Sequence, residues 1–201
     1  MNIEPLTGGD LGAAASVLAR AFRDNPAMVE MLRAKNDADR ERVLLPCMDG
    51  FAASVIRYGT AEIVKDAGQV VAVSLFFPPG AFPPPAFATV MQAKGPIRAG
   101  VGNAIRIARV DYEMRKRHPH YPHYYLWFLG VERTRQGQGL GSMLLRSLNA
   151  RADADRVACY LETDKPTSVK LYEHHGYAVE HTEPLPPIDV PLWFMKRPAP
   201  A

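Results

Sequence analysis

The chain has 201 residues, 47% hydrophobic and 22% charged, a composition typical of one soluble globular domain with or without an insertion. Its formal net charge is +3, from 24 lysines and arginines against 21 acidic residues, an excess too small to indicate a nucleic-acid partner. Cys47 and Cys159 lack the spacing of a zinc site or a disulfide framework. With no secretory leader visible and no apolar run near the roughly 18 residues that cross a bilayer, we expect a cytoplasmic protein.

The N-terminal region predicts a strand followed by helices. Residues 1–6 are typical of a short strand, and Asp10 is placed to cap a helix whose apolar side chains recur at helical spacing as far as Phe22. Asn25 and Pro26 should break that helix, and residues 27–33 can add another turn or two.

The next segment predicts a long helix and a hairpin. Residues 37–58 show a second helical pattern, which Pro46 is expected to kink or divide because proline cannot donate the helical hydrogen bond. Residues 61–65 and 69–77 predict two strands joined by a tight Asp-Ala-Gly turn.

A proline-rich connector, "PPGAFPPPA", then begins a long insertion at residues 78–121. Within it, residues 87–94 and 101–117 predict helices, and we expect the insertion to form a helical flap over the acceptor side of the molecule. We treat residues 1–201 as a single domain.

The remainder of the chain alternates strands and helices, so the whole sequence predicts an α/β fold with a mixed sheet. Gly176 is expected just beyond a helix, where a positive φ is needed. In order, the elements are a strand at 123–131, a helix from the glycine segment to about 151, a strand at 156–163, a helix at 166–175, and strands at 177–183 and 189–197.

The stretch "RQGQGLG" at 135–141 joins a buried strand to an amphipathic helix. Glycines at alternate positions before a helix N-terminus can present successive free N–H groups to a pyrophosphate, although a plain connecting turn would also use glycine. A P-loop does not fit, because no Gly-Lys-Ser/Thr follows. A dinucleotide fingerprint has Glu162 near the required ribose-binding offset, but five residues separate Val131 from Gly137 where the fingerprint has its first glycine directly after the strand.

Two motifs in order resemble one known family. The run from Gln136 to Gly141 resembles the Q/R-x-x-G-x-G/A signature of the GNAT acyltransferase superfamily, and "LYEHHGYAV" at 171–179 resembles its L-Y-x-x-x-G-F element. The resemblance is specific over residues 124–179 and implies an α/β (α+β) GNAT fold. That fold has a mixed, mostly antiparallel central sheet with helices on both faces, and here a helical insertion before the fourth strand.

The resemblance implies an N-acetyltransferase that moves an acetyl group from acetyl-CoA, its cosubstrate, to a primary amine of a small molecule. Strand N–H groups would hold the pantetheine arm and polarise the thioester carbonyl, and the glycine loop would hold the pyrophosphate. Ser168 stands where the family often has a coenzyme-contacting asparagine. The implied coenzyme-binding residues are Leu129, Gly130, Val131, Gln136, Gly137, Gln138, Gly139, Leu140, Gly141, Ser142, Ser168 and Tyr172.

Two residues are candidates for catalysis. Tyr172 occupies the position of the family's usual general acid, although it can also be a core aromatic residue. Glu162, at a strand end facing the gap, is the candidate base, acting directly or through water, although it can instead be a solvated strand end or a partner of Lys165. Arg133 and Arg135 can contact phosphate or simply lie in solvent.

Other features carry less weight. His118, His120 and His123 are held apart by prolines and lack a nearby acidic or cysteine ligand, so we expect no metal site. The basic, aromatic residues 106–125 are explained by a helix with a basic outer face, so we expect no nucleic-acid binding. The apolar end strand at 191–195 can pair with another chain, giving a possible homodimer. The functional alternatives are a non-catalytic acyl-CoA sensor and a dinucleotide-binding oxidoreductase.

Overall fold

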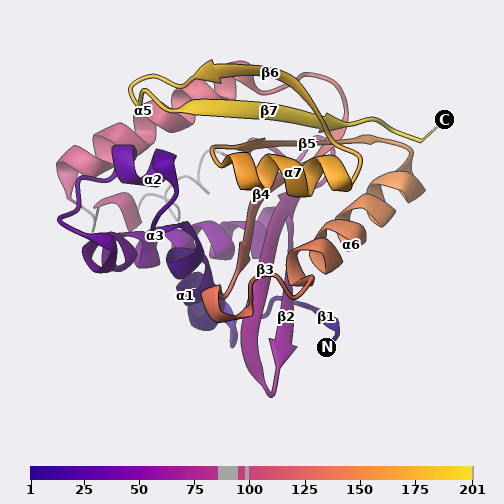
Figure 1. Cartoon of the computed structure of the whole chain (residues 1–201), viewed down its shortest axis with the longest axis horizontal. Coiled ribbons are helices and arrows are strands. Elements are labelled where there is room, and N and C mark those ends of the chain that lie inside the picture. Colours follow the sequence, from indigo (N-terminus) through magenta and orange to yellow (C-terminus); the bar gives the residue numbers. More distant parts are fainter. Residues whose placement is uncertain (86–94, 98–99, 201) are drawn as a thin grey trace.

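The computed structural model describes residues 1–85, 95–97 and 100–200, whose strands form one open sheet with helices on both faces (Figure 1). The strand order is β1-β2-β3-β4-β5-β7-β6, and the pairs are antiparallel except for β4 with β5. The predicted α/β fold with a mostly antiparallel sheet is therefore confirmed. None of the helices described is long and apolar enough to cross a membrane.

The predicted order of elements is also confirmed, apart from the helix expected at residues 87–94, which lies outside the described residues. The first half contains β1 (Ile3–Pro5), α1 (Leu11–Phe22), α2 (Pro26–Met31), α3 (Asp37–Tyr58), β2 (Thr60–Asp66) and β3 (Gln69–Phe77). The second half contains α5 (Val101–Arg117), β4 (His123–Val131), the 3-10 turn η1 (Arg133–Arg135), α6 (Leu140–Asp155), β5 (Ala158–Thr163), α7 (Pro166–His174), β6 (Ala178–Pro184) and β7 (Pro191–Arg197).

Two local predictions need correction. Asp10 precedes α1 but does not cap it through its side chain, because its carboxylate instead accepts a hydrogen bond from Thr7 and pairs with Lys65. Of the two outcomes expected at Pro46, a kink or a division, the division does not occur, because α3 continues as one helix through the proline. In the turn beside it, the Cys47 thiol donates to the carbonyl of Val43. Gly176, by contrast, has the predicted positive φ, at 85°.

The two faces of the sheet have separate cores, because neighbouring residues of a strand point to opposite sides. Phe77, Tyr125 and Phe128 pack with α1 and α3 on one face. Phe76, Tyr124 and Leu126 pack with α6 and Tyr172 on the other. Each strand of the centre is therefore buried on both sides, which explains why β3 is apolar along most of its length.

Helix α1 approaches β4 very closely at Gly130. A Cβ built on this glycine would lie 2.8 Å from Cδ2 of Leu18, closer than two carbon atoms can pack. Only glycine therefore lets α1 lie directly on β4, and this contact places the end of α1 beside the carboxyl end of the strand.

Strands β4 and β5 separate part-way along their length. Their parallel pairing ends at Leu126 and Leu161, although β4 continues to Val131. A bulge coincides with this point: Leu75 pairs with Phe128 and Phe76 with Leu126, so Trp127 is the extra residue. A bulge bends its strand, and here it turns β4 away from β5 to open a gap.

The prediction that β7 pairs with another chain required this strand to lie at the edge of the sheet. It does not lie there. It lies between β5 and β6, with both of its edges paired (Figure 1). The hairpin folds back so that the later strand joins β5 and the earlier one, β6, forms the edge. The possible homodimer through residues 191–195 therefore loses its structural basis.

Candidate functional site

A cleft of about 710 Å³ occupies the gap between β4 and β5. Its floor comes from the free part of β4, and its walls come from the loops that follow β4 and β5 and from the first turns of α6 and α7. Most of the predicted coenzyme-binding residues line it, namely Leu129, Val131, Gln136, Gly137, Gly139, Leu140, Gly141, Ser142, Ser168 and Tyr172. Glu162 lines it as well. The remaining two lie differently: Gly130 packs against α1, and the side chain of Gln138 donates to the Thr134 carbonyl.

The glycine loop has the geometry of an anion site. Gly137 and Gly139 have φ of 75° and 79°, which only glycine adopts readily, and there is open space where their Cβ atoms would lie. In the described part of the chain, no acceptor is bonded to the N–H groups of residues 137–142. Unpaired N–H groups at a helix N-terminus suit a phosphate, so these residues fit the pyrophosphate of coenzyme A.

Two serines, Ser142 and Ser168, line the cleft beside this loop. Nε2 of His175 lies 2.9 Å from Oγ of Ser142, in the first turn of α6. Ser168, in the first turn of α7, faces the cleft with its hydroxyl free of any hydrogen bond recorded within the described residues. The cleft is therefore bounded by the positive ends of two helices, α6 and α7.

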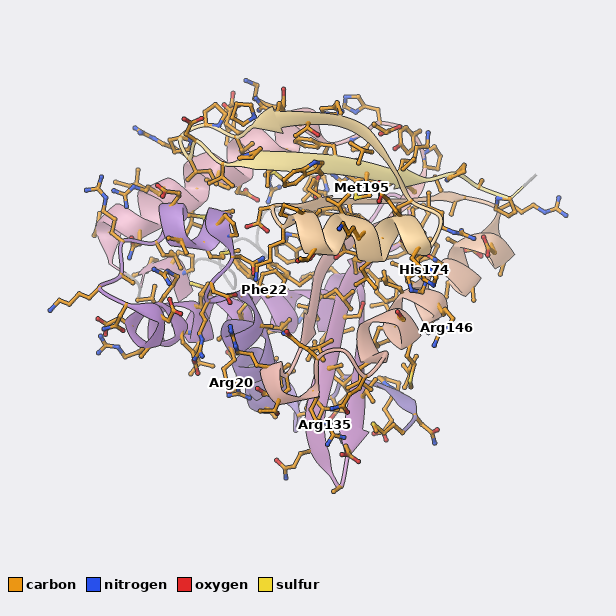
Figure 2. The ribbon with its side chains drawn as sticks, viewed as in Figure 1. Arg20, Phe22, Arg135, Arg146, His174 and Met195 are labelled. Atoms are coloured by element: carbon orange, nitrogen blue, oxygen red, sulfur yellow. The ribbon has the colours of Figure 1, made fainter. Side chains whose placement is uncertain are left out.

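The arginines after β4 are paired rather than free. Nη1 of Arg133 lies 2.8 Å from Asp24, and Arg135 pairs with Asp66 (Figure 2 labels Arg135). Asp24 also binds Nζ of Lys165 at 2.8 Å, so one carboxylate ties the end of α1 to the loops after both splayed strands. Burial favours the neutral acid, but hydrogen bonds from Lys165 and Arg133 lower the pKa of Asp24 to about 2. Of the two arginines, only Arg135 lines the cleft.

Tyr172 is buried at the cleft wall, 8% exposed. Burial, with a smaller effect of Asp164, raises the pKa of its phenol well above the ordinary value. The hydroxyl thus keeps its proton throughout the physiological range, as a proton donor to a departing thiolate must. Its ring also packs in the core cluster of α6 and α7, so both interpretations of this residue from the sequence are compatible with its position.

Glu162 lies on β5 one residue beyond the last pair with β4. Its Oε1 atom is buried without a well-formed hydrogen bond in the described part of the chain. Burial raises the pKa of the carboxyl to about 7, against the opposing effect of the nearby Tyr125 and Tyr160 hydroxyls. No ion pair forms with Lys165, which binds Asp24 instead. A carboxylate with a pKa near 7 in a cleft is suited to accept a proton at neutral pH.

The cleft meets a second, apolar cavity of about 180 Å³. Six residues line both spaces: Phe22, Asn25, Trp127, Glu162, Thr163 and Asp164. Phe22, at the end of α1, points toward the middle of the molecule, where its ring lies 5.3 Å from that of Phe128 (Figure 2). Glu162 therefore stands where a group in the cleft can meet a molecule in the cavity.

Asn25 and Asp164 are the main features of this junction that the sequence did not reveal. The two oxygens of buried Asp164 accept hydrogen bonds from Nδ2 of Asn25 at 3.0 Å and from the Ala27 N–H at 2.8 Å. A residue after β5 thus caps the N-terminus of α2 from far along the chain. The available signals were the Asn-Pro break and a second acidic residue after the strand.

We expect Asp164→Ala to destabilise the protein by about 2–4 kcal/mol, because it leaves buried donors of Asn25 and Ala27 unpaired. Urea unfolding measures the change. The control is Asp153→Ala, which removes the half-exposed partner of Arg197 and should lower stability by only about 0.2–1 kcal/mol. Equal losses in the two variants would contradict this role of Asp164.

Comparison with known proteins identifies the family. The model of the acetyltransferase (GNAT) family matches residues 99–177, which include the glycine loop, Glu162 and Tyr172. Residues 99–177 thus carry a GNAT acetyltransferase domain. This match supports an acyltransferase that acts on amines, as the two sequence motifs predicted. A search of curated protein sequences gave no match.

Solved structures share the fold of this GNAT chain over nearly their whole length. A structure described as histone acetyltransferase HPA2 and related acetyltransferase, from Corynebacterium glutamicum, has a TM-score of 0.73 at 22% identity, covering 100% of this chain and 97% of that one. A polyamine N-acetyltransferase from Drosophila melanogaster has a TM-score of 0.60 at 17% identity, covering 97% and 98%. A ribosomal-protein-alanine N-acetyltransferase from Brucella melitensis has a TM-score of 0.56 at 17% identity, covering 98% of each chain.

The architecture of the GNAT chain also counts against the dinucleotide alternative. A dinucleotide fold needs successive parallel strands with crossover helices, whereas β4 and β5 are the only parallel neighbours among the described strands.

The histidines considered for a metal site do not line the cleft. Nε2 of His118 lies 3.1 Å from Nε2 of His123. Burial, followed by the neighbouring histidines, lowers the pKa of His118 to about 4. No group of three potential metal ligands gathers within the described residues.

Proposed function

We propose that this GNAT chain transfers the acetyl group of acetyl-CoA directly to a primary amine of a small molecule. The observation that carries the proposal is the arrangement of one cleft. The glycine loop, a protonated phenol at Tyr172 and a carboxylate of raised pKa at Glu162 all face the same space.

The cleft supports a definite placement of the cosubstrate. The N–H groups of residues 137–142 would bind the pyrophosphate, and the unpaired edge of β4 beyond Leu126 would bind the pantetheine arm. Ser142 and Ser168 lie on the helix ends beside it. A backbone N–H on this edge would stabilise the oxyanion that forms from the thioester carbonyl.

The proposed reaction then needs two proton transfers. An alkylamine of pKa ~10.4 is neutral in only about one molecule in 2,500 at pH 7, and this neutral form attacks the thioester and then has one proton to lose to a base. Its nitrogen forms a bond to the acetyl carbon, its proton passes to Glu162 directly or through water, and the carbon–sulfur bond breaks. Tyr172 donates its proton to the departing thiolate. The products are the acetamide and coenzyme A.

We propose that the insertion at residues 78–121 serves the acceptor side. Helix α5, the described helix of that segment, presents Ile107, Val110, Asp111 and Met114 to the apolar cavity. Their spacing of three and four residues places them on one face of the helix.

We expect saturating acetyl-CoA to raise the melting temperature by roughly 5–10 °C, because a ligand at 100 times its Kd adds about 2.7 kcal/mol to a domain of this size. NAD should have no effect. Differential scanning calorimetry measures both, and the absence of a shift with acetyl-CoA would overturn the proposed function.

The binding site within the cleft is tested by Gly139→Glu, which puts a carboxylate into the proposed phosphate site and should remove the thermal shift. Gly68→Glu is a matched control, because Gly68 also has a positive φ and open space at its Cβ but lies in the β2–β3 turn. Both variants carry the same backbone strain and charge. Coenzyme affinity retained in Gly139→Glu would contradict the assignment of the loop.

A further inference from the structure

The apolar cavity beside the cleft has a mostly apolar lining. Helices α1, α2 and α5, strand β4 and the segment before β7 contribute its walls. Apart from the six residues shared with the cleft, the described lining residues are Ala27, Met28, Met31, Phe51, Phe82, Ile107, Val110, Asp111, Met114, Tyr125, Phe128, Leu185, Ile188 and Leu192. Such a lining favours an apolar occupant, and the methionines allow it some variation in shape.

The charges of this cavity are already paired, with one exception. Asp111 binds Nε of Arg115 at 2.7 Å, and both oxygens of Asp164 accept hydrogen bonds from Asn25 and Ala27. Within the described residues, Glu162 has no ion-pair partner, and its Oε1 is buried without a well-formed hydrogen bond, with the Tyr125 and Tyr160 hydroxyls nearby. One amine can therefore be received at Glu162, whereas a second cation deeper in the described lining would meet only Asp111, whose charge Arg115 already balances.

The volume restricts the occupant further. An apolar cavity of about 150 Å³ accommodates a benzene ring, so a cavity of 180 Å³ suits a single ring or an alkyl chain of similar bulk. The rest of a larger acceptor, such as a nucleotide or a peptide, would have to extend outside these walls.

We propose that the acceptor is a primary monoamine with an apolar body the size of one aromatic ring, such as an arylalkylamine, rather than a polyamine or an amine with a guanidinium tail. This inference rests on the proposed function. The amine nitrogen lies at Glu162, and the apolar body fills the cavity between α2, α5 and β4.

The sharpest comparison uses two amines with equal numbers of non-hydrogen atoms, hexylamine and 1,5-diaminopentane, which differ in a terminal methyl against a terminal ammonium. We expect kcat/KM to be at least ~100-fold higher for hexylamine, because removing a charge from water without a partner is strongly unfavourable. 2-Phenylethylamine should be a good substrate as well, and agmatine a poor one. Equal or higher kcat/KM for the diamine would overturn the proposal.

Calorimetric titration of the two amines in the presence of coenzyme A separates this inference from the proposed function. Tighter binding of hexylamine supports the cavity assignment whether or not turnover occurs, and equal or tighter binding of 1,5-diaminopentane overturns it. An absence of acetylation for every amine, with acetyl-CoA still bound, overturns the proposed function instead.

A pair of variants on one helix tests the location. Ile107→Glu places a carboxylate in the cavity, whereas Ile105→Glu makes the same change at a residue 49% exposed on the same helix. We expect Ile107→Glu to lower kcat/KM for hexylamine by ~10–100-fold and to raise that for 1,5-diaminopentane, with Ile105→Glu unchanged. The acetyl-CoA thermal shift reports whether each variant is folded, and Met28→Glu repeats the test from α2. Unaltered selectivity in both cavity variants would refute the assignment.

Discussion

Tyr172→Phe should lower kcat by about 10²–10⁴-fold while leaving the affinity for acetyl-CoA nearly unchanged. The substitution removes one hydroxyl, and with it the proton that the proposed reaction gives to the thiolate. The ring remains to pack in the cluster of α6 and α7, so little stability should be lost. Steady-state release of coenzyme A and calorimetric binding measure the two quantities separately.

Tyr124→Phe is the matched control for this experiment. Tyr124 belongs to the same core cluster, and its hydroxyl donates to Asp155 at 2.7 Å, away from the cleft. The control should keep its kcat. A protein that only senses coenzyme A would show no turnover in the parent or in either variant, and unchanged kcat in Tyr172→Phe would eliminate the phenol as the acid.

The second large effect concerns Glu162. We expect Glu162→Gln to lower kcat/KM for the amine by about 10²–10⁴-fold at pH 8 and to change its pH dependence. The carboxylate of raised pKa must be ionised to act as the base, so below about pH 7 its titration adds to that of the amine. A logarithmic plot for the parent should therefore rise with a slope of two below this pH and of one above it. The variant should keep a slope of one throughout.

The thermal stability of Glu162→Gln shows whether its loss of kcat/KM comes from the missing base or from unfolding. Because burial raises the pKa of Glu162 from 4.5 to about 7, the folded protein retains a proton that the unfolded chain releases in this range. Stability should fall as the pH rises from about 4.5 to 7, by up to about 3 kcal/mol, and Glu162→Gln removes this loss. The variant should thus melt at the same or a higher temperature than the parent at pH 8. A lower melting temperature with an unchanged pH profile would contradict the assignment.

The control for a buried carboxylate on a strand is Glu62→Gln. Glu62 lies in β2 and pairs with Arg151 at 2.6 Å, outside the cleft. It should affect stability through that pair while leaving the pH profile of kcat/KM unaltered. A similar change of profile in both variants would mean that Glu162 has no special role.

Local features of the sequence predicted most of the elements. Helical periodicity predicted α1 and α3, and alternation with turn residues predicted the β2–β3 hairpin, because each signal depends on neighbouring residues. The position of β7 between β5 and β6 could not be predicted from the sequence. A hairpin determines that β6 and β7 pair, but not which of the two joins β5, since that choice depends on packing across the sheet.

The candidate site likewise contains some features that local sequence predicts and others that depend on distant contacts. The glycine loop follows from local backbone requirements at Gly137 and Gly139, and it was predicted correctly as a turn entering a helix. The hydrogen bond between Asn25 and Asp164 joins residues 139 positions apart, and no local pattern encodes such a contact. The pairing of Arg133 with Asp24 was hidden for the same reason, because charged residues in a loop give no sign of their partners.

The boundary between the cleft and the apolar cavity has a consequence for how this protein changes over evolutionary time. Beyond the six shared residues, the walls of the two spaces are separate, and those of the cavity come largely from α2, α5 and the segment before β7. Substitutions there can alter the accepted amine without touching the residues proposed to hold acetyl-CoA. A related protein can thus evolve specificity for a new acceptor through substitutions in the cavity walls, while the residues of the cleft stay unchanged.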